Sequence, residues 1–378
     1  MATALRRVAI KFAGESGQGV NSIGEIIAKA CKRSGFKVFA YREYPSLIQG
    51  GNAAYQIDVS DNQVNSSTSK VDLLVCISRH SIHAYLETLM DGGLLVHSIS
   101  KVAFTNQEQK WISDHKINVL NVDTFATAKS LGGNYFTSSM VMTGYVGALL
   151  GIGDGKLTDI ISAEFADKPE LLDIDLKCLQ GGYKLLGEKL ASLNLPTVFK
   201  TDPEWESSLV LSGNQAIGTG AIAAGVRVVY GYPMTPASSI LSFLADQSQR
   251  TGMVVKQAED EITAAQMTLG SMFMGTRAMT TTSGGGFDLM TESISLAGMT
   301  ETPFVCVLAQ RPGPATGVPT WTAAGDLNLA IYAGHGEFPR IVLAASDAAS
   351  AYRLTQEAFN LAENYQTVVV LLTEKQIA

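Results

Sequence analysis

The sequence VAIKFAGESGQGVNSIGEIIAKA, residues 8–30, decides the fold class of this chain. It opens with a short apolar run over residues 8–13, which is typical of a buried strand. A glycine-rich loop, GESGQG at residues 14–19, follows, and apolar side chains then recur at helical spacing over residues 23–30. The stretch therefore predicts a strand, a tight turn and a helix, which is the repeating unit of α/β folds.

The same alternation of apolar runs and periodic segments continues along the rest of the chain. The predicted strands are 8–13, 37–41, 53–59, 71–77, 93–97 and 117–122 in the first half, and 227–230, 253–256, 277–281, 304–309, 341–344 and 367–372 in the second. The main predicted helices are 80–90, 171–190, 214–225, 237–250, 259–274, 287–297 and 348–363. We therefore predict two doubly wound α/β domains, each with helices on both faces of its sheet.

A break in this pattern marks the expected domain boundary. The stretch SLNLPTVFKTDPEW, residues 192–205, contains two prolines and mixed polar residues. Such composition is typical of a connection between domains. We place the boundary after residue 195, which gives a first domain over residues 1–195 and a second over residues 196–378.

Composition and charge restrict the classes of function. The 28 basic and 35 acidic residues leave a formal charge of −7, so nucleic acid is not an expected partner. The four cysteines lie far apart in sequence, so we expect neither zinc nor an iron–sulfur cluster in this chain. Scattered thiols and the lack of a secretory pattern in residues 1–17 favour the cytoplasm. The uncharged stretch 131–153 favours a buried helix over a membrane span.

The GESGQG loop is the first candidate site. Backbone N–H groups at a strand-to-helix turn favour an anion such as phosphate, so Gly14, Gly17 and Gly19 are candidate cofactor-binding residues. The spacing G-x-x-G-x-G differs from both the dinucleotide pattern and the P-loop, which disfavours a Rossmann dehydrogenase and a nucleoside triphosphatase. A tight turn packed on the sheet explains the glycines equally well.

The segment GYPMTPAS, residues 231–238, connects a predicted strand to a predicted helix. Tyr232 and Pro233 begin this connection, and Thr235 follows where the carboxyl ends of parallel strands bind ligands. The alternative is a helix cap, because Thr235 before Pro236 is the pattern of an N-cap and a first helical residue. From the residues alone, the cap is the better explanation of this pair.

Glu259, Asp260 and Glu261 form an acidic cluster at the start of the helix predicted for residues 259–274. The helix dipole explains Glu259 and Asp260. Glu261 is different because it precedes Ile262 in a helix that is otherwise poor in charge. If its side chain points inward, burial favours its protonated form and suits it to proton exchange.

Two further loops follow predicted strands of the second half. TTTSGGGFDL, residues 280–289, places Ser283 and Gly284 in a glycine turn, which either lets the backbone approach a ligand closely or simply closes a tight turn. QRPGPATGVPT, residues 310–320, contains three prolines and a single charge, Arg311. A guanidinium at a strand end suits a carboxylate, and a solvated surface arginine is the alternative.

Taken together, these motifs resemble the 2-oxoacid:ferredoxin oxidoreductases, specifically an α subunit fused behind its γ domain. FAGESGQG at residues 12–19 resembles the γ domain. The remaining resemblance rests on GNQAIGTGAIAAG (213–225), YPMTPAS (232–238), EDEI (259–262), RPGPATGVPT (311–320) and GHGEFPR (334–340). The resemblance implies thiamine-dependent oxidative decarboxylation of a 2-oxoacid, with 2-oxoglutarate preferred and pyruvate as the alternative. Coenzyme A would accept the acyl group and ferredoxin the electrons.

The resemblance also implies roles for individual residues. The second domain would be the pyrimidine-binding half of a thiamine diphosphate site, with Glu261 on the aminopyrimidine N1′. Thr235 and Arg311 would bind the 2-oxoacid, Arg311 through the carboxylate. The other cofactor contacts would come from Tyr232, Pro233, Ser283 and Gly284.

The same resemblance implies a hetero-oligomer. The diphosphate, its Mg²⁺ and a [4Fe–4S] cluster would belong to a separate β subunit, and residues 14–19 would lie near coenzyme A. Two features depart from the family pattern. The chain ends soon after the strand at 367–372, where family α subunits typically continue into another domain, and Trp321 and Ala324 replace polar or basic residues of relatives associated with 2-oxoglutarate. The alternative function is a non-catalytic assembly or binding subunit, or a fragment of such a complex.

Overall fold

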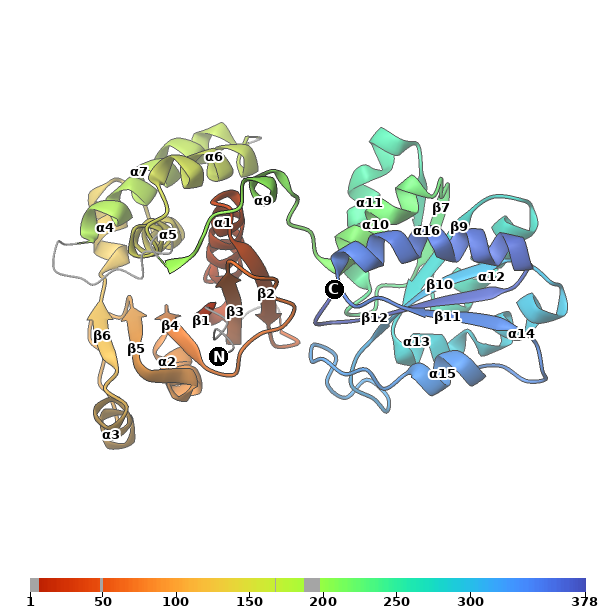
Figure 1. Ribbon diagram of the computed structural model, residues 1–378, viewed down its shortest axis with the longest axis horizontal. Helices are drawn as coiled ribbons and strands as arrows, with labels where there is room; N and C mark the ends of the chain where they lie inside the picture. Colours follow the sequence, from red (N-terminus) through yellow and green to blue (C-terminus); the bar gives the residue numbers. More distant parts are fainter. Residues whose placement is uncertain (1–6, 48–49, 167, 187–197) are drawn as a thin grey trace. The chain divides into compact units, whose positions relative to one another are not determined.

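The computed structural model describes residues 7–47, 50–166, 168–186 and 198–378. The chain divides into two compact units, Met1–Val210 and Leu211–Ala378. Each unit contains a six-stranded sheet flanked by helices, so the predicted α/β class is confirmed (Figure 1). The boundary predicted after residue 195 lies outside the described residues.

The sheet of the first unit is mixed, in the order β2-β3-β1-β4-β5-β6. Strand β3 is antiparallel to both β1 and β2, whereas β1, β4, β5 and β6 are parallel. The strands are β1 (Arg7–Ser16), β2 (Lys37–Glu43), β3 (Gly50–Ser60), β4 (Val71–Cys76), β5 (Leu89–His97) and β6 (Asn118–Asn121). The helices are α1 (Val20–Arg33), α2 (Arg79–Tyr85), η1 (Leu86–Thr88), α3 (Asn106–Asp114), α4 (Thr124–Ser130), α5 (Ser138–Leu149), α6 (Asp154–Glu164), α7 (Pro169–Leu185) and α9 (Pro203–Ser207).

Two layers of helices bury this sheet. Helices α1, α5, α6 and α7 pack on one face of the sheet, where Ile10 and Phe12 of β1 join the same hydrophobic core. Helices α2 and α3 pack on the other face, where Ala9 and Ala13 of β1 join a second core (Figure 1). The helix predicted over residues 80–90 is wrong at its end, because Leu89 already begins β5. The uncharged stretch contains the buried helix α5, as predicted. No described helix has both the length and the apolar character needed to cross a membrane.

The contact between α5 and α7 depends on glycine. A Cβ atom on Gly144 would overlap the carbonyl oxygen of Leu179, so the two backbones touch directly. We expect Gly144→Ala to lower the free energy of unfolding by about 3 kcal/mol, because the added methyl group would force two closely packed helix backbones apart. Urea unfolding measures this loss. The control is Gly155→Ala in α6, where an added Cβ meets nothing within 4 Å and stability should be unchanged or slightly higher. Equal stability of the two variants would contradict the packing described.

The second unit has an entirely parallel sheet in the order β11-β12-β10-β9-β7-β8. The strands are β7 (Val228–Gly231), β8 (Val254–Gln257), β9 (Ala278–Thr282), β10 (Phe304–Gln310), β11 (Arg340–Ala344) and β12 (Val368–Glu374). The helices are α10 (Gly213–Ala223), α11 (Ser238–Thr251), α12 (Glu261–Phe273), α13 (Gly284–Leu289), α14 (Thr291–Met299), α15 (Leu327–Tyr332) and α16 (Ala348–Tyr365).

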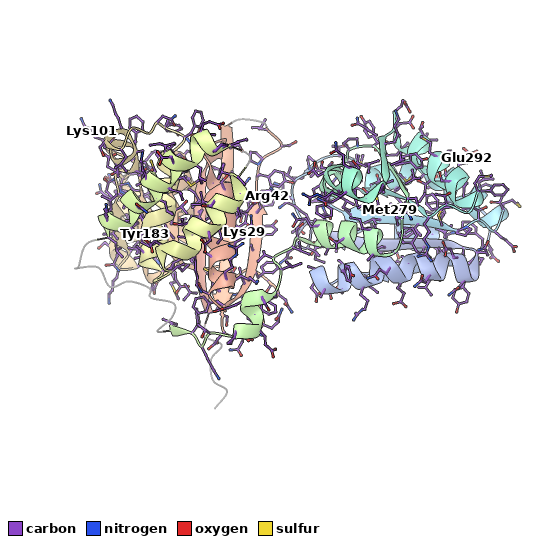
Figure 2. The ribbon with its side chains drawn as sticks, turned by 90° about the horizontal axis from the view of Figure 1, so that it is seen from above. Lys29, Arg42, Lys101, Tyr183, Met279 and Glu292 are labelled. Carbon is purple, nitrogen blue, oxygen red and sulfur yellow. The ribbon has the colours of Figure 1, made fainter. Side chains whose placement is uncertain are left out.

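The order of the strands fixes where a ligand can bind in this unit. Helices α10, α11 and α16 cover one face and α12 to α15 the other, so the central strands are buried (Figure 1). Met279 of β9 lies inside the unit, whereas Glu292 of α14 lies at its surface (Figure 2). After β7 the chain moves to β8 on one side, and after β9 it moves to β10 on the other. The carboxyl ends of β7 and β9 therefore flank the switch point at which α/β sheets bind ligands.

Candidate functional site

Four neighbouring strands of the second unit end beside the candidate residues. Tyr232 follows β7, and Glu261 comes shortly after β8 as the first residue of α12. Ser283 follows β9, and Arg311 follows β10. Because these strands are adjacent and parallel, their loops meet at one edge of the sheet. The topology thus brings together residues that are distant in sequence.

Glu261 points into the protein, as the sequence predicts. Asp260 is the N-cap of α12, and its carboxylate accepts a hydrogen bond from the backbone N–H of Thr263 at 2.7 Å. The next residue, Glu261, is only 4% exposed. Its Oε1 atom is buried and has no hydrogen-bond partner among the described residues. A buried acceptor without a partner carries a desolvation cost that a bound ligand with a hydrogen-bond donor would remove.

The glycine turn after β9 makes room for carboxylates on two sides. A Cβ atom on Gly286 would lie 2.7 Å from Cγ and 2.8 Å from Oε1 of Glu261 and would overlap Thr282. A Cβ atom on Gly284 would lie 2.8 Å from Oδ2 of Asp326. Both glycines are therefore needed for close approach. Ser283 Oγ is also buried without a partner among the described residues.

Arg311 is buried, so the alternative of a solvated surface arginine is wrong. The residue is 7% exposed, and its Nη1 donates a hydrogen bond to the carbonyl oxygen of Thr235 at 2.7 Å. It forms no salt bridge within the part of the chain that the structure describes. Burial lowers the pKa of its guanidinium, and the Asp326 and Glu261 carboxylates act in the opposite direction. A buried cation that lacks a salt bridge is suited to an anionic ligand.

The turn between β7 and α11 holds Thr235 in place. Helix α11 begins at Ser238 with Ala237 as its N-cap, so the explanation of Thr235 as a helix cap is wrong. Instead, the buried Asn214 side chain donates hydrogen bonds to Pro236 O at 2.8 Å and Ser239 Oγ at 2.7 Å. This tertiary anchor fixes the turn whose carbonyl group receives Arg311.

Tyr232 and Pro233 lie at the exposed start of the same turn. Tyr232 is 39% exposed, and Pro233 is exposed as well. The pair therefore provides ring surface beside the buried polar groups. This placement is compatible with contact to a planar ligand, and the role predicted for the two residues stays a prediction.

Sequence reasoning missed Asp326. This residue precedes the short helix α15, which was not predicted either, and its backbone N–H donates to Gln310 Oε1 at 2.9 Å. Gln310 is the residue before Arg311, so the loop of residues 311–325 returns to its own starting point. The only sequence signal is an Asp before an apolar segment, which any helix start would show.

The glycines of the predicted GESGQG loop in the first unit are required for different structural reasons. Strand β1 continues to Ser16, so the turn itself is shorter than predicted. Gly17 and Gly19 have positive φ angles of 94° and 82°, which explains glycine at both positions. A Cβ on Gly14 would lie 2.8 Å from Val20 Cγ2, so Gly14 is explained by packing. Anion binding by this loop stays a prediction.

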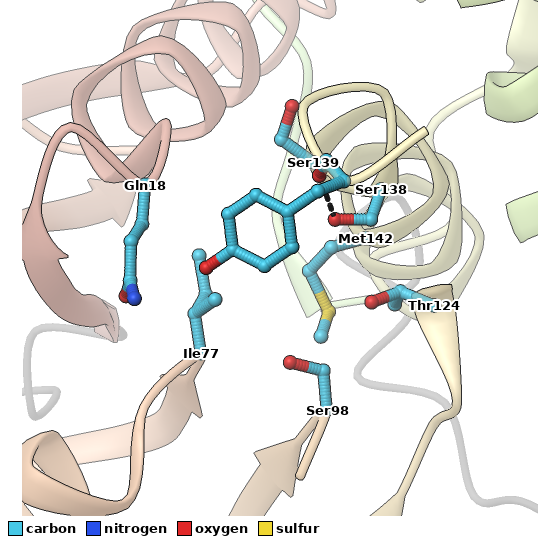
Figure 3. Close-up of a pocket in the computed structure, with 8 residues that line it drawn as sticks. Gln18, Ile77, Ser98, Thr124, Ser138, Ser139 and Met142 are labelled. Atoms are coloured by element: carbon cyan, nitrogen blue, oxygen red, sulfur yellow. Dashed lines mark hydrogen bonds between the residues drawn. The ribbon is translucent and has the colours of Figure 1, made fainter. Parts of the chain in front are cut away.

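Two concave features lie at the carboxyl edge of the first sheet. A small pocket of about 10 Å³ is lined by residues from the ends of strands and from the start of α5, which are Gln18, Ile77, Ser98, Thr124, Tyr135, Ser138, Ser139 and Met142 (Figure 3). A larger hollow of about 590 Å³ is lined by Glu15, Arg79, His80 and His83. Arg79 and His83 there are both paired with Glu108.

Comparison with known families assigns the two parts of the chain separately. Residues 9–185 match the family model described as pyruvate ferredoxin/flavodoxin oxidoreductase. Residues 219–378 match a model described as the thiamine diphosphate-binding part of pyruvate flavodoxin/ferredoxin oxidoreductase. The second match contains the strands and loops that bring Glu261, Arg311 and Thr235 together.

Individual relatives cover nearly the whole chain. The α subunit of a 2-oxoacid:ferredoxin oxidoreductase from Sulfolobus sp. is 32% identical over 98% of this chain and 65% of the relative. The 2-oxoglutarate synthase subunit KorA from Methanocaldococcus jannaschii is 42% identical over 44% of this chain and 45% of the relative. The chain thus spans about 65% of the length of the longer curated relatives that it matches.

A solved structure is similar over nearly the whole chain as well. The 2-oxoglutarate:ferredoxin oxidoreductase from Magnetococcus marinus, with 2-oxoglutarate, coenzyme A and succinyl-CoA bound, matches with a TM-score of 0.88 and 31% identity. The match covers 99% of this chain and 64% of that chain.

Proposed function

The chain belongs to the 2-oxoacid:ferredoxin oxidoreductase family, and on this premise we propose that its second unit contributes half of a thiamine-dependent active site. The complete enzyme would carry out the CoA-acylating oxidative decarboxylation of a 2-oxoacid and pass the electrons to ferredoxin. The relatives named for 2-oxoglutarate support 2-oxoglutarate as the first substrate to test, with pyruvate as the second.

One observation carries this proposal. At one edge of the parallel sheet, Arg311 is a buried guanidinium without a salt bridge among the described residues, and Glu261 Oε1 is a buried acceptor without a partner there. A 2-oxoacid supplies the missing carboxylate. The N1′ nitrogen of an aminopyrimidine ring supplies the missing hydrogen-bond partner, because it would share one proton with the Glu261 carboxyl group. The unpaired guanidinium of Arg311 and the unpartnered carboxyl oxygen of Glu261 thus match two different ligands of one reaction, the 2-oxoacid and the cofactor.

The residues present fit thiamine diphosphate. Glu261 would hold the pyrimidine ring through a hydrogen bond to N1′, while Gly284 and Gly286 let that ring approach the backbone of the turn. Tyr232 and Pro233 would line the open side of the ring. Bound thiamine diphosphate supplies the electron sink that decarboxylation needs.

This chain's own residues would position the substrate and exclude water. Arg311 would bind the carboxylate with the N–H donors that do not contact Thr235, and the bond to Thr235 O fixes the plane of the guanidinium. Glu261 would hold a proton at its carboxyl group and exchange it with the ring nitrogen. Burial of both residues keeps these hydrogen bonds away from bulk water.

A partner subunit would complete the site. As the family resemblance implies, we assign the diphosphate, Mg²⁺ and a [4Fe–4S] cluster to a β subunit. The four cysteines of this chain are buried and lie far apart in sequence, which does not suit a cluster. Exposed apolar side chains of this loop and of α15 support a covering partner, namely Val318, Trp321, Leu327, Ile331 and Tyr332.

The first unit would contribute to the coenzyme A site. Gly19 is the N-cap of α1, and Gly17 lies in the turn before it. A glycine N-cap has no side chain that could accept from the first backbone N–H groups of the helix, so these groups stay available to a phosphate. The adjacent pocket (Figure 3) presents hydroxyl groups from Ser98, Thr124 and Ser138. Coenzyme A is therefore the ligand to test at this edge.

Reconstitution tests the proposal. Mixed with a family β subunit, thiamine diphosphate, Mg²⁺ and coenzyme A, the chain should support reduction of ferredoxin or of a viologen dye that depends on an added 2-oxoacid. A panel with 2-oxoglutarate and pyruvate identifies the substrate. A complex that assembles but shows no turnover with any 2-oxoacid would instead favour an assembly subunit.

Gly286→Ala tests whether Glu261 must keep its position. The added Cβ would press on Cγ and Oε1 of Glu261, so we expect a loss of turnover of about 10²-fold with intact assembly. The matched control is Gly285→Ala, one residue earlier, where a Cβ meets nothing within 4 Å. Steady-state dye reduction compares the two variants. Similar turnover in both would refute the placement of Glu261.

A further inference from the structure

The most exposed large apolar side chains among the described residues of the second unit share one position in the fold. Each lies at the end of a helix, shortly before the strand that follows, and each is between 68% and 83% exposed. They form what we call the amino-edge patch, which consists of Phe273 and Met274 (α12), Met299 (α14), Tyr332 (α15) and Tyr365 (α16). Because the strands are all parallel, these helix ends lie at the amino-terminal edge of the sheet (Figure 1). The patch is therefore at the edge opposite Glu261 and Arg311.

Tertiary contacts fix one side of the amino-edge patch. The motif GHGEFPR, residues 334–340, connects α15 to β11 and has no part in the candidate site. Within it, the His335 N–H donates to Ser295 Oγ of α14 at 3.1 Å. A Cβ atom on Gly298 of α14 would lie 2.5 Å from the Phe338 ring, so the loop rests directly on that helix. A surface held in this way loses little conformational freedom when a partner binds.

The size and composition of the amino-edge patch are those of an interface. Its five side chains expose roughly 700 Å² in total, since a large side chain of this kind carries about 200 Å² when fully exposed. Monomers rarely leave an apolar patch larger than about 600 Å² in contact with water. One side of a standard protein–protein interface buries about 800 Å². Phenylalanine, tyrosine and methionine are also the apolar residues that such interfaces prefer.

Exposed charges of opposite sign lie at the two ends of the same edge. Glu337 precedes β11 and Glu301 precedes β10, whereas Arg227 precedes β7 and Arg250 precedes β8. In the strand order β11-β12-β10-β9-β7-β8, the acids therefore lie toward one end and the bases toward the other. A partner of a single charge sign would suit only half of this edge. A second copy of the edge, turned by 180°, would suit all of it.

We propose that the amino-terminal edge of the second unit binds the same edge of a second copy of this chain around a two-fold axis. Such an interface is self-complementary, because each copy offers the same apolar patch and the acidic end of one meets the basic end of the other. Strands β10 and β9 are central in the sheet, so the axis passes close to Met299 and Phe273. Glu337 of each copy then faces Arg250 of the other. The carboxyl edge stays open to the cofactor and the β subunit, so this inference does not rest on the proposed function.

Sedimentation equilibrium of the full chain tests the proposal. We expect the wild-type chain to sediment at twice the mass of one chain at micromolar concentration. Met299→Glu places an unpaired charge at the centre of the interface and should raise the Kd of the dimer by at least about 10²-fold. The control is Tyr352→Glu, an exposed apolar position near the start of α16, which should leave the dimer intact. A monomeric wild-type chain, or a dimer that is equally tight in Met299→Glu, would overturn the proposal.

A charge exchange tests the two-fold arrangement. Glu337→Arg and Arg250→Glu should each raise the Kd of the dimer by about tenfold, because each brings like charges together. The chain that carries both substitutions should regain the wild-type Kd. Single substitutions without effect, or no recovery in the double variant, would overturn the arrangement. If Met299→Glu instead prevents binding of a family β subunit, the edge belongs to that subunit and the proposal is wrong.

Discussion

Glu261→Ala is expected to lower the turnover of the reconstituted complex by about 10³-fold while the chain stays folded. Removal of a general acid–base group typically costs between about 10² and 10⁴ in rate. Two observations justify the large effect. The residue is almost fully buried, and its Oε1 atom has no partner in the described chain, which is the arrangement expected of a carboxyl group that binds the cofactor.

A matched control distinguishes chemistry from charge. Glu259 lies two residues earlier, outside α12, and is exposed. Glu259→Ala removes the same charge from the same segment and should retain nearly full turnover. Dye reduction with a saturating 2-oxoacid and thermal unfolding of each variant provide the comparison. Equal activity of the Glu261 and Glu259 variants would exclude the role assigned to Glu261.

Arg311→Lys is expected to raise the KM for the 2-oxoacid by about 10²-fold. Lysine keeps the charge but loses the planar fork and the bond from Nη1 to Thr235 O. Disruption of a buried charge-assisted pair costs about 3 kcal/mol, which corresponds to roughly 10² in affinity. The KM for coenzyme A should stay unchanged, because the candidate residues for that ligand lie in the other unit.

The control for Arg311 is an exposed arginine of the same unit. Arg353 lies on α16, which covers the opposite face of the sheet from α12. Arg353→Gln should leave both KM values unaltered. If Arg311→Lys changes only kcat, the guanidinium does not bind the ground-state carboxylate, and a different residue must be sought.

The strands and most helices could be predicted from sequence because apolar residues follow one pattern along a buried strand and a different period along a helix. Strand β10 is buried at every position, and its predicted range ends only one residue short of the observed one. Sheet topology could not be predicted in the same way. The antiparallel β3 depends on pairing between segments that are distant in sequence, and a hydrophobic run has no direction.

In the candidate site, too, features that depend on local sequence could be predicted, and features that depend on contacts between distant segments could not. Arg311 stands out as the single charge of its loop, and Glu261 stands out as the last acid before a helix that is otherwise poor in charge. Thr235 was harder to interpret, since a local cap pattern suggested one structure and the hydrogen bonds from Asn214 enforce another. Asp326 was missed because its meaning depends on the return of a loop to Gln310, which no periodicity records.

The most direct test of the role of Glu261 is the exchange of the C2 proton of thiamine diphosphate bound to the assembled complex. Quenched-flow deuterium exchange followed by proton NMR measures this rate without any 2-oxoacid. We expect Glu261→Gln to slow exchange by at least about 10²-fold, since the amide cannot exchange a proton with the ring nitrogen. Exchange as fast in this variant as in wild type would contradict the assignment of Glu261 to the cofactor.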